Sequence, residues 1–199
     1  DCWDLEYNFP FGFKELEGIA DRSHYDLQQH IKHSGQDLSL FDEETKQKII
    51  PHVVAEPSLG VDRAFLVFMF DAYEYDKKRD NIVLKLNPKL APVKVAVFPL
   101  LKNKKSLVKK ARDVYNLLKE KFVCIYDESS SIGRRYARQD ESGTFLGVTI
   151  DFDSLKKNDC TIRSRDTTKQ IRVKIKDLKE VIEKLIEGGN LSKFGKYIN

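Results

Sequence analysis

The chain has 199 residues, of which 41% are hydrophobic and 33% are charged, so it can bury a core and its composition excludes a disordered protein. No apolar run approaches the ~20 residues that a bilayer-spanning helix needs, and the first four residues, DCWD, do not read as a signal peptide. The three cysteines lie far apart without a Cys-x-x-Cys pair, which argues against a disulfide framework and a structural zinc site. We therefore expect a cytoplasmic protein with no membrane partner.

The net charge of +4 hides two halves of opposite sign. Residues 1–91 carry 11 Lys and Arg against 17 Asp and Glu, which is a net −6, whereas residues 92–199 carry 24 against 14, which is a net +10. Such asymmetry is typical of a chain in which the basic part meets a polyanion. The alternative is that lysine-rich helices only solvate the surface.

The first half has less regular patterns. In chain order they predict an extended segment over residues 9–17, a helix over 42–49 and a strand over 52–55 that runs into Glu56-Pro57-Ser58. The segment RAFLVFMFDAY at residues 63–73 is apolar nearly all round, which predicts a helix buried at the centre of a larger domain. Residues 76–91 are polar and contain Asn87-Pro88, and they predict a loop and linker.

The second half alternates strand and helix signals, which predicts an α/β layer. Strands are expected at 93–98, 122–126 and 146–152, with a cationic amphipathic helix over 104–121, a short serine-capped helix near residue 134 and a last helix ending at Gly188-Gly189. The first strand, helix and second strand predict a parallel crossover. Residues 160–165 and 170–175 alternate apolar and polar around a polar turn, which predicts a hairpin.

Several separate words of the sequence resemble one enzyme family. EPSLGVDRAF at residues 56–65 resembles motif 3 of the class II aminoacyl-tRNA synthetases. DCWD and FGFKELEGIADRSHYDLQQH at 11–30 resemble the glycyl-tRNA synthetases of the archaeal and eukaryotic type, and SSSIGRRYARQDESGT and GVTIDFD resemble their anticodon-binding domain. The resemblance implies that residues 1–91 are the C-terminal portion of a class II catalytic domain, with an antiparallel sheet. It implies that residues 92–199 are an α/β anticodon-binding domain with a mixed sheet.

The implied activity is the ATP-dependent activation of glycine and its transfer to the 3′ end of tRNA(Gly), with Mg²⁺ arriving on ATP and no prosthetic group. The amino-acid carboxylate attacks the α-phosphate of ATP, so the site must hold a polyanion and neutralise charge that builds in the transition state. Arg63, near the start of a helix, adds a fork of donors to free backbone N–H groups and is the candidate catalytic residue. The alternative is an arginine that pairs with Asp62 or Asp71.

Glycine offers an ammonium, a carboxylate and no side chain, so its site needs clustered acceptors and walls that leave no room for a methyl group. The resemblance implies that Glu15, Glu56 and Ser58 line this pocket. It also implies that Arg22 faces the pocket and that Glu56 and Arg63 contact ATP. The alternative for Glu15 is a solvated acid at an exposed strand edge.

The basic half supplies candidate tRNA contacts, because guanidinium groups neutralise phosphates and aromatic rings stack on unpaired bases. These candidates are Arg134, Arg135, Tyr136, Arg138, Arg163 and Arg165. The alternative, left open for each residue, is an internal ion pair with Asp127, Glu128, Asp140 or Glu141.

The family's motif 1, which builds a dimer interface, and its motif 2, which carries an arginine for the α-phosphate, are absent from these residues. We therefore expect a fragment of a homodimeric protein that has no aminoacylation activity alone. The alternative function is a catalytically silent, synthetase-like accessory subunit that binds nucleic acid. His24, His30 and His33 have helical spacing, but no Cys or acidic residue completes a zinc pattern, and we expect no metal site.

Overall fold

The computed structural model describes residues 1–198, which fall into two compact units, Asp1–Phe70 and the part from Asp71 onward. Each unit has a sheet of its own. Among the described residues, none of the helices combines the length and the apolar character that a membrane crossing requires.

The first unit contains a three-stranded antiparallel sheet of order β1-β2-β5, and this unit ends at Phe70 rather than at the expected residue 91. Strands β1 (Cys2–Phe9) and β2 (Gly12–Ala20) form a hairpin, and β5 (Glu56–Leu59) pairs with the other edge of β2. Leu5 lies opposite Glu17 but Glu6 lies opposite Glu15, so one extra residue of β2 forms a β-bulge between them. A bulge of this kind reverses the side-chain alternation of the strand beyond it.

The segment between β2 and β5 holds helix α1 (Tyr25–Ser34) and a hairpin of β3 (Leu40–Asp42) and β4 (Gln47–Ile49). The predicted helix over 42–49 is therefore wrong. The Asp42 carboxylate accepts bonds from the Glu44 N–H and the Thr45 hydroxyl, and Lys46 has φ +56°, so local turn chemistry wins over helix propensity. The predicted strand over 52–55 is also wrong, because Val53 forms only an isolated bridge with Ser23.

Helix α2 (Val61–Ala72) follows β5 directly. Its aromatic side chains are exposed in this chain: Phe65 by 64%, Phe68 by 49% and Phe70 by 39%. The expected burial inside a larger domain therefore does not come from the residues described here. Beyond α2, strands β6 (Tyr73–Asp76) and β7 (Asn81–Leu84) form a hairpin where a linker was predicted. Val83 and Ala91 are 0% and 1% exposed, so this segment packs into the second unit.

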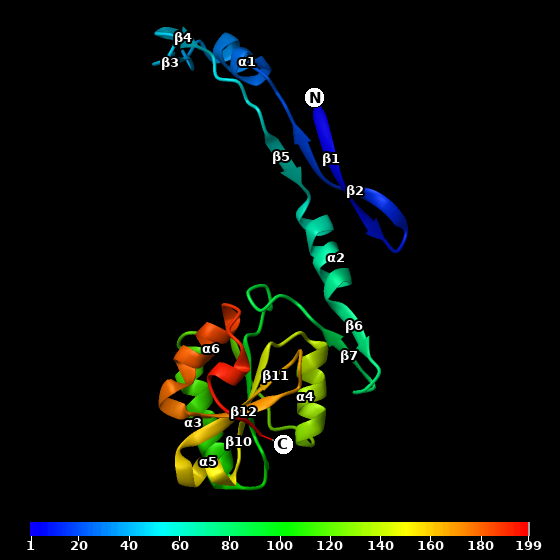
Figure 1. Ribbon diagram of the computed structural model, residues 1–199, viewed down its shortest axis with the longest axis vertical. Helices are drawn as coiled ribbons and strands as arrows, with labels where there is room; N and C mark the ends of the chain where they lie inside the picture. The colour runs from blue at the N-terminus through cyan, green and yellow to red at the C-terminus, as the bar shows by residue number, and fades with distance from the viewer. Residues whose placement is uncertain (199) are drawn as a thin grey trace. The chain divides into compact units, whose positions relative to one another are not determined.

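The second unit contains a six-stranded mixed sheet, which confirms the predicted α/β fold (Figure 1). Its order is β13-β12-β11-β10-β8-β9, with β8 (Val95–Pro99) parallel to both β9 (Cys124–Tyr126) and β10 (Leu146–Ile150). Strands β11 (Asp159–Ser164), β12 (Gln170–Lys174) and β13 (Tyr197–Ile198) continue the sheet in antiparallel fashion. The predicted parallel crossover and the predicted hairpin are both confirmed.

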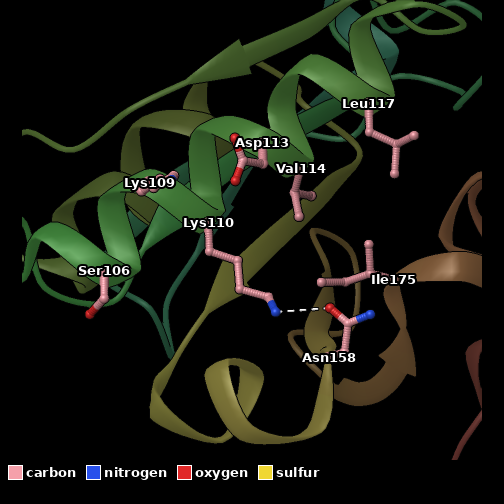
Figure 2. Close-up of a pocket in the computed structure, with 8 residues that line it drawn as sticks. All are labelled: Ser106, Lys109, Lys110, Asp113, Val114, Leu117, Asn158 and Ile175. Carbon is pink, nitrogen blue, oxygen red and sulfur yellow. Dashed lines mark hydrogen bonds between the residues drawn. The ribbon is translucent and has the colours of Figure 1, made fainter.

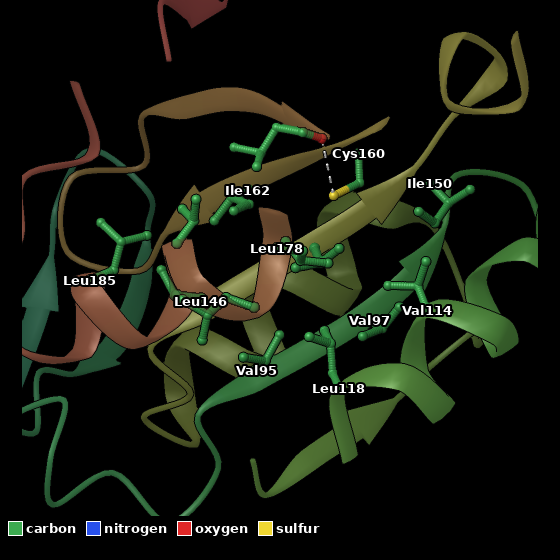
Figure 3. Packing of buried hydrophobic residues seen from close by; sticks show 14 of the residues in the cluster. Val95, Val97, Val114, Leu118, Leu146, Ile150, Cys160, Ile162, Leu178 and Leu185 are labelled. Atoms are coloured by element: carbon green, nitrogen blue, oxygen red, sulfur yellow. Dashed lines mark hydrogen bonds between the residues drawn. The ribbon is translucent and has the colours of Figure 1, made fainter. Parts of the chain in front are cut away.

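Helices cover both faces of this sheet. Helices α3 (Lys105–Lys119) and α6 (Leu178–Ile186) lie on one face, and α4 (Ile132–Glu141) lies on the other (Figure 1). The short helix α5 (Phe152–Lys157) follows β10. The main core lies between the sheet and the pair α3 and α6, where Leu118, Val97, Ile162 and Leu178 are fully buried (Figure 3). The apolar stripes read from the sequence are the faces that pack here.

Candidate functional site

Strand register gathers several acidic side chains on one face of the first unit's sheet. Gly18 in the central strand lies opposite Asp4 of β1 and Ser58 of β5, and Glu56 of β5 lies opposite Ala20, two residues further along. Residues directly opposite each other, and residues two apart on one strand, point to the same face of a sheet. Asp4, Glu56 and Ser58 therefore share one face.

The bulge adds Glu15 to this face. A Cβ atom built on Gly18 would lie 3.6 Å from Asp4 Oδ1 and 3.8 Å from Glu15 Oε1, so both carboxylates converge on the spot where Gly18 has no side chain. Glu6, which lies opposite Glu15, belongs to the same side. We call the set Asp4, Glu6, Glu15, Glu56 and Ser58 around Gly18 the acidic face. Its members are exposed in this chain.

Arg22 reaches the acidic face from the segment that follows β2. Its Nε atom lies 3.2 Å from Glu56 Oε2, and its guanidinium also donates two bonds of 2.7 Å to the Asp26 carboxylate. These bonds raise the pKa of Arg22 above its usual range and lower that of Asp26. The backbone bridge between Ser23 and Val53 holds the two segments together, so the arginine and Glu56 meet although they are far apart in the sequence.

Arg63 lies at the first turn of α2, and its Nη1 atom donates a 2.6 Å bond to the carbonyl oxygen of Glu15. Neither Asp62 nor Asp71 is its ion-pair partner among the described residues. The guanidinium is exposed and retains further donors beside the acidic face. The sequence-predicted residues thus lie around one sheet: Glu15, Arg22, Glu56, Ser58 and Arg63.

The predicted tRNA contacts in the second unit are mostly occupied inside the domain. Arg135 is 1% exposed and donates to the carbonyls of Ser129, Ser130 and Pro99. Burial lowers its pKa. Arg165 is 2% exposed and donates bonds of 2.8 and 2.7 Å to the carbonyls of Gly143 and Leu86, respectively.

Two more predicted contacts belong to a buried ion-pair cluster. Arg163 donates 2.8 and 2.9 Å bonds to both oxygens of Asp140, and Arg79 of the β6–β7 hairpin donates to the same carboxylate at 3.2 Å. The Arg163 guanidinium also lies 4.6 Å from the centre of the Tyr136 ring. The Tyr136 hydroxyl bonds Thr149 at 2.6 Å, so both side chains are engaged by partners within the unit.

Arg138 and Arg134 are the remaining predicted contacts. Arg138 pairs with Asp127 at 2.6 Å. Burial raises the pKa of Asp127, but the bonds from Arg138 and Ser129 together keep it below the usual value. Arg134 is exposed, and among the described residues its side chain makes no hydrogen bond or ion pair.

Exposed cations gather at one edge of the six-stranded sheet. Helices α3, α4 and α5 are the elements that follow the carboxyl ends of the parallel strands β8, β9 and β10 along the chain, so their N-termini share that edge. Neither α3 nor α4 has an acidic residue in its first turn. Lys102, Lys104, Lys105 and Arg134 are exposed there; we call these four the basic edge. The carboxyl ends of parallel strands are where open α/β sheets bind ligands.

A separate groove runs along α3 on the core side of the sheet (Figure 2). Ser106, Lys109 and Asp113 line it from the helix, and Lys110 donates a 2.8 Å bond to the Asn158 side chain, which also lines it. The groove contains none of the sequence-predicted residues.

The histidines do not form a metal site in the described residues, where no group of three His, Cys, Asp or Glu side chains is arranged for a metal. His52 bonds the Asp21 carboxylate at 2.6 Å, which lowers the pKa of Asp21. His24 contacts the Pro51 carbonyl at 3.2 Å through Nδ1. Both are therefore used to hold the segment between β2 and β5.

Sequence reasoning missed Asp4, Gly18 and the lysines of the basic edge. The two-residue spacing of Asp4 and Glu6 was a signal for a shared strand face. The run KNKK at 102–105 after a buried strand was a signal for cations at a sheet edge. The pairing of β2 with β5 was not readable, because 35 residues lie between Ala20 at the end of β2 and Glu56 at the start of β5.

Comparison with known proteins agrees with the expected family. Residues 94–185 match the family described as an anticodon binding domain. The chain is 48% identical over 187 residues to the glycine–tRNA ligase of Clostridium acetobutylicum and 51% identical over 186 residues to that of Caldanaerobacter subterraneus subsp. tengcongensis. In both cases the match covers 92% of this chain and 40% of the relative, so the chain spans about two fifths of the relatives' length. Over most of its length the chain is therefore similar to a segment of glycine–tRNA ligases, and residues 94–185 of that segment match an anticodon binding domain.

Proposed function

We propose that the protein containing this chain is a glycine–tRNA ligase, which forms glycyl-adenylate from glycine and ATP and passes glycine to the 3′ end of tRNA(Gly). In this proposal residues 1–91 are the C-terminal portion of its catalytic domain and residues 92–199 its anticodon-binding domain. The observation that supports it best is the acidic face with two arginines beside it, since the site needs acceptors for an ammonium and donors for a polyanion. The ion pair between Arg22 and Glu56, whose charged atoms lie 3.2 Å apart, places a positive and a negative group side by side in this site.

The reaction assigns a task to each group. The carboxylates of Glu15 and Glu56 and the hydroxyl of Ser58 accept hydrogen bonds from the glycine ammonium. Arg22 orients the glycine carboxylate, whose oxygen attacks the α-phosphorus of ATP while pyrophosphate leaves. Arg63 donates to the departing phosphates, where negative charge accumulates. Mg²⁺ enters bound to the phosphates of ATP as part of the substrate.

Glycine-dependent exchange between ATP and pyrophosphate tests this proposal. A full-length ligase is assembled by placing this chain in the C. acetobutylicum enzyme, in exchange for the 187 residues that match it. We expect exchange with glycine and none with alanine. The 199-residue chain alone is expected to give none, because motifs 1 and 2 are supplied by the rest of the ligase. If this chain comes from a silent accessory subunit instead, the assembled protein should bind tRNA but should bind no glycyl-adenylate analogue.

We further propose that tRNA contacts the second unit through the basic edge. Its four cations are exposed, whereas Arg135, Arg163 and Arg165 are buried with partners. Changing Lys102, Lys104 and Lys105 together to Gln should weaken tRNA binding and reduce the slope of log affinity against log salt by about 2. The control changes three exposed lysines at or just beyond the C-terminal ends of α3 and α6, namely Lys119, Lys121 and Lys184, and should leave the slope unchanged. A homodimer in the cytoplasm is part of the same proposal.

A further inference from the structure

Gly18 lies in the middle of the acidic face, and its backbone conformation does not explain why this residue is a glycine. Its φ angle lies outside the left-handed region, in contrast to that of Gly12 at +101°. An L-amino acid can therefore adopt this conformation without strain. Glycine inside a strand weakens the strand, since it packs nothing and loses more chain entropy than any other residue. The conformation of β2 thus does not explain the glycine.

Packing does not explain it either. A methyl group at Gly18 would contact Asp4 Oδ1 at 3.6 Å and Glu15 Oε1 at 3.8 Å, which are ordinary van der Waals distances. By contrast, a methyl group at Gly147 would come within 2.5 Å of the Tyr136 ring, where glycine is a steric requirement. The protein's own atoms leave room for alanine at position 18.

The remaining explanation is a ligand that approaches the backbone closely, which is a recurrent reason for glycine within a strand. Across the sheet, Asp4, Gly18 and Ser58 lie in one row, and Glu15 and Glu56 flank that row on β2 and β5. The row has carboxylate acceptors at one end, a hydroxyl at the other and no side chain between them. An ammonium group that bonds both Asp4 and Glu15 at about 2.8 Å lies over this bare stretch of β2.

We propose that Gly18 is a specificity-determining residue of the glycine site, and that Asp4 is an additional acceptor for the substrate ammonium. The inference rests on the proposed function. Because Gly18 has no side chain, its backbone forms the surface over which the ammonium and the α-carbon of the substrate glycine lie. A methyl group there takes the space of the substrate without disturbing the protein.

The test uses the assembled full-length ligase described above, with Gly18→Ala, Asp4→Asn and, as the matched control, Gly133→Ala. A Cβ atom at Gly133 meets nothing within 4 Å. We measure KM for glycine and for ATP in the exchange reaction. Gly18→Ala and Asp4→Asn should each raise KM for glycine ~10- to 100-fold, the range that one misplaced methyl group or one lost polar contact gives. KM for ATP should stay within about twofold, and Gly133→Ala should change neither value.

The outcomes separate this inference from the proposed function. An unsubstituted ligase that shows no glycine-dependent exchange overturns the proposed function and this inference with it. An active ligase whose KM for glycine is unchanged by Gly18→Ala overturns this inference alone. An equal rise in both KM values also overturns it, because damage to the whole site would then be the cause. Thermal unfolding of the assembled ligase with Gly18→Ala should occur at the temperature of the parent ligase or slightly above it, because alanine fits at this position and removes the entropy cost of glycine in a strand; a lower unfolding temperature would overturn the inference.

Discussion

The buried carboxylate of Asp140 offers a sharp test of how the second unit is held together. Its side chain is 4% exposed and lies between Arg163, which is 11% exposed, and Arg79, which is 16% exposed. Asp140→Asn keeps the shape but removes the charge, leaving two guanidinium groups without their shared counter-charge. Breaking a buried ion pair from one side costs about 3 to 5 kcal/mol.

We expect the lower end of that range, because Arg79 keeps its 2.8 Å bond to Asp76 and its bonds to the carbonyls of Arg165 and Asp166. A loss of about 3 kcal/mol corresponds to a fall in Tm of roughly 10 °C for a unit of this size. Urea unfolding, monitored by hydrogen exchange in peptides of α4 and β11, measures the free energy of unfolding of this unit alone.

A matched control is Glu180→Gln, which breaks an exposed pair with Lys184 on α6 and should cost less than about 0.5 kcal/mol. The double variant Asp140→Leu with Arg163→Met removes the charges from both sides and should recover most of the loss, since apolar residues can replace a buried ion pair. A cost below about 1 kcal/mol for Asp140→Asn would refute the reasoning, because it would mean that the cluster is solvated enough to tolerate an unpaired guanidinium.

Two further predictions concern the same unit. Gly147→Ala places a Cβ atom 2.5 Å from the Tyr136 ring and should destabilise the unit by about 1 to 3 kcal/mol in urea unfolding, since overpacking costs that much; Gly133→Ala should cost nothing. Burial raises the pKa of Asp151, but the bonds and charge of Arg172 together with the two bonds from Ser154 outweigh burial and hold this pKa below its usual value. Ionised Asp151 therefore contributes its full stabilisation of the folded unit above about pH 4, and this contribution is lost as pH falls through the lowered pKa of Asp151. Arg172→Gln should lower stability at neutral pH and converge with the parent in acid, and parallel curves would contradict this.

The α/β layer was predictable because each of its elements carries a continuous pattern. Helix α3 buries Leu107, Ala111, Val114 and Leu118 at helical spacing, and the flanking strands are short apolar runs. Where local turn chemistry decides, the pattern failed. Residues 42–49 contain good helix formers, but the bonds accepted by the Asp42 side chain close a hairpin turn instead.

The roles of the arginines were not predictable for a different reason. Strict alternation along β11 correctly places Arg163 and Arg165 on the face opposite the apolar core. Alternation does not tell what covers that face. Helix α4 covers this face through Asp140, and the β6–β7 hairpin covers it through Arg79. The arginine side chains that the alternation of β11 would place in solvent are therefore buried. The lysines at the start of α3 have no such cover and stay exposed.

The candidate glycine site depends on a detail that no pattern in the sequence carries. Glu15 and Gly18 are three residues apart, so in a regular strand their side chains would point to opposite faces. The bulge at Leu16 changes this: Glu15 lies opposite Glu6, and Glu17 lies opposite Leu5. Because Asp4 and Glu6 share a face of β1, Glu15 joins Gly18 on the acidic face and Glu17 turns to the other. The family resemblance named Glu15 and not Glu17, and the bulge is the physical reason why only one of these two acids can serve the site.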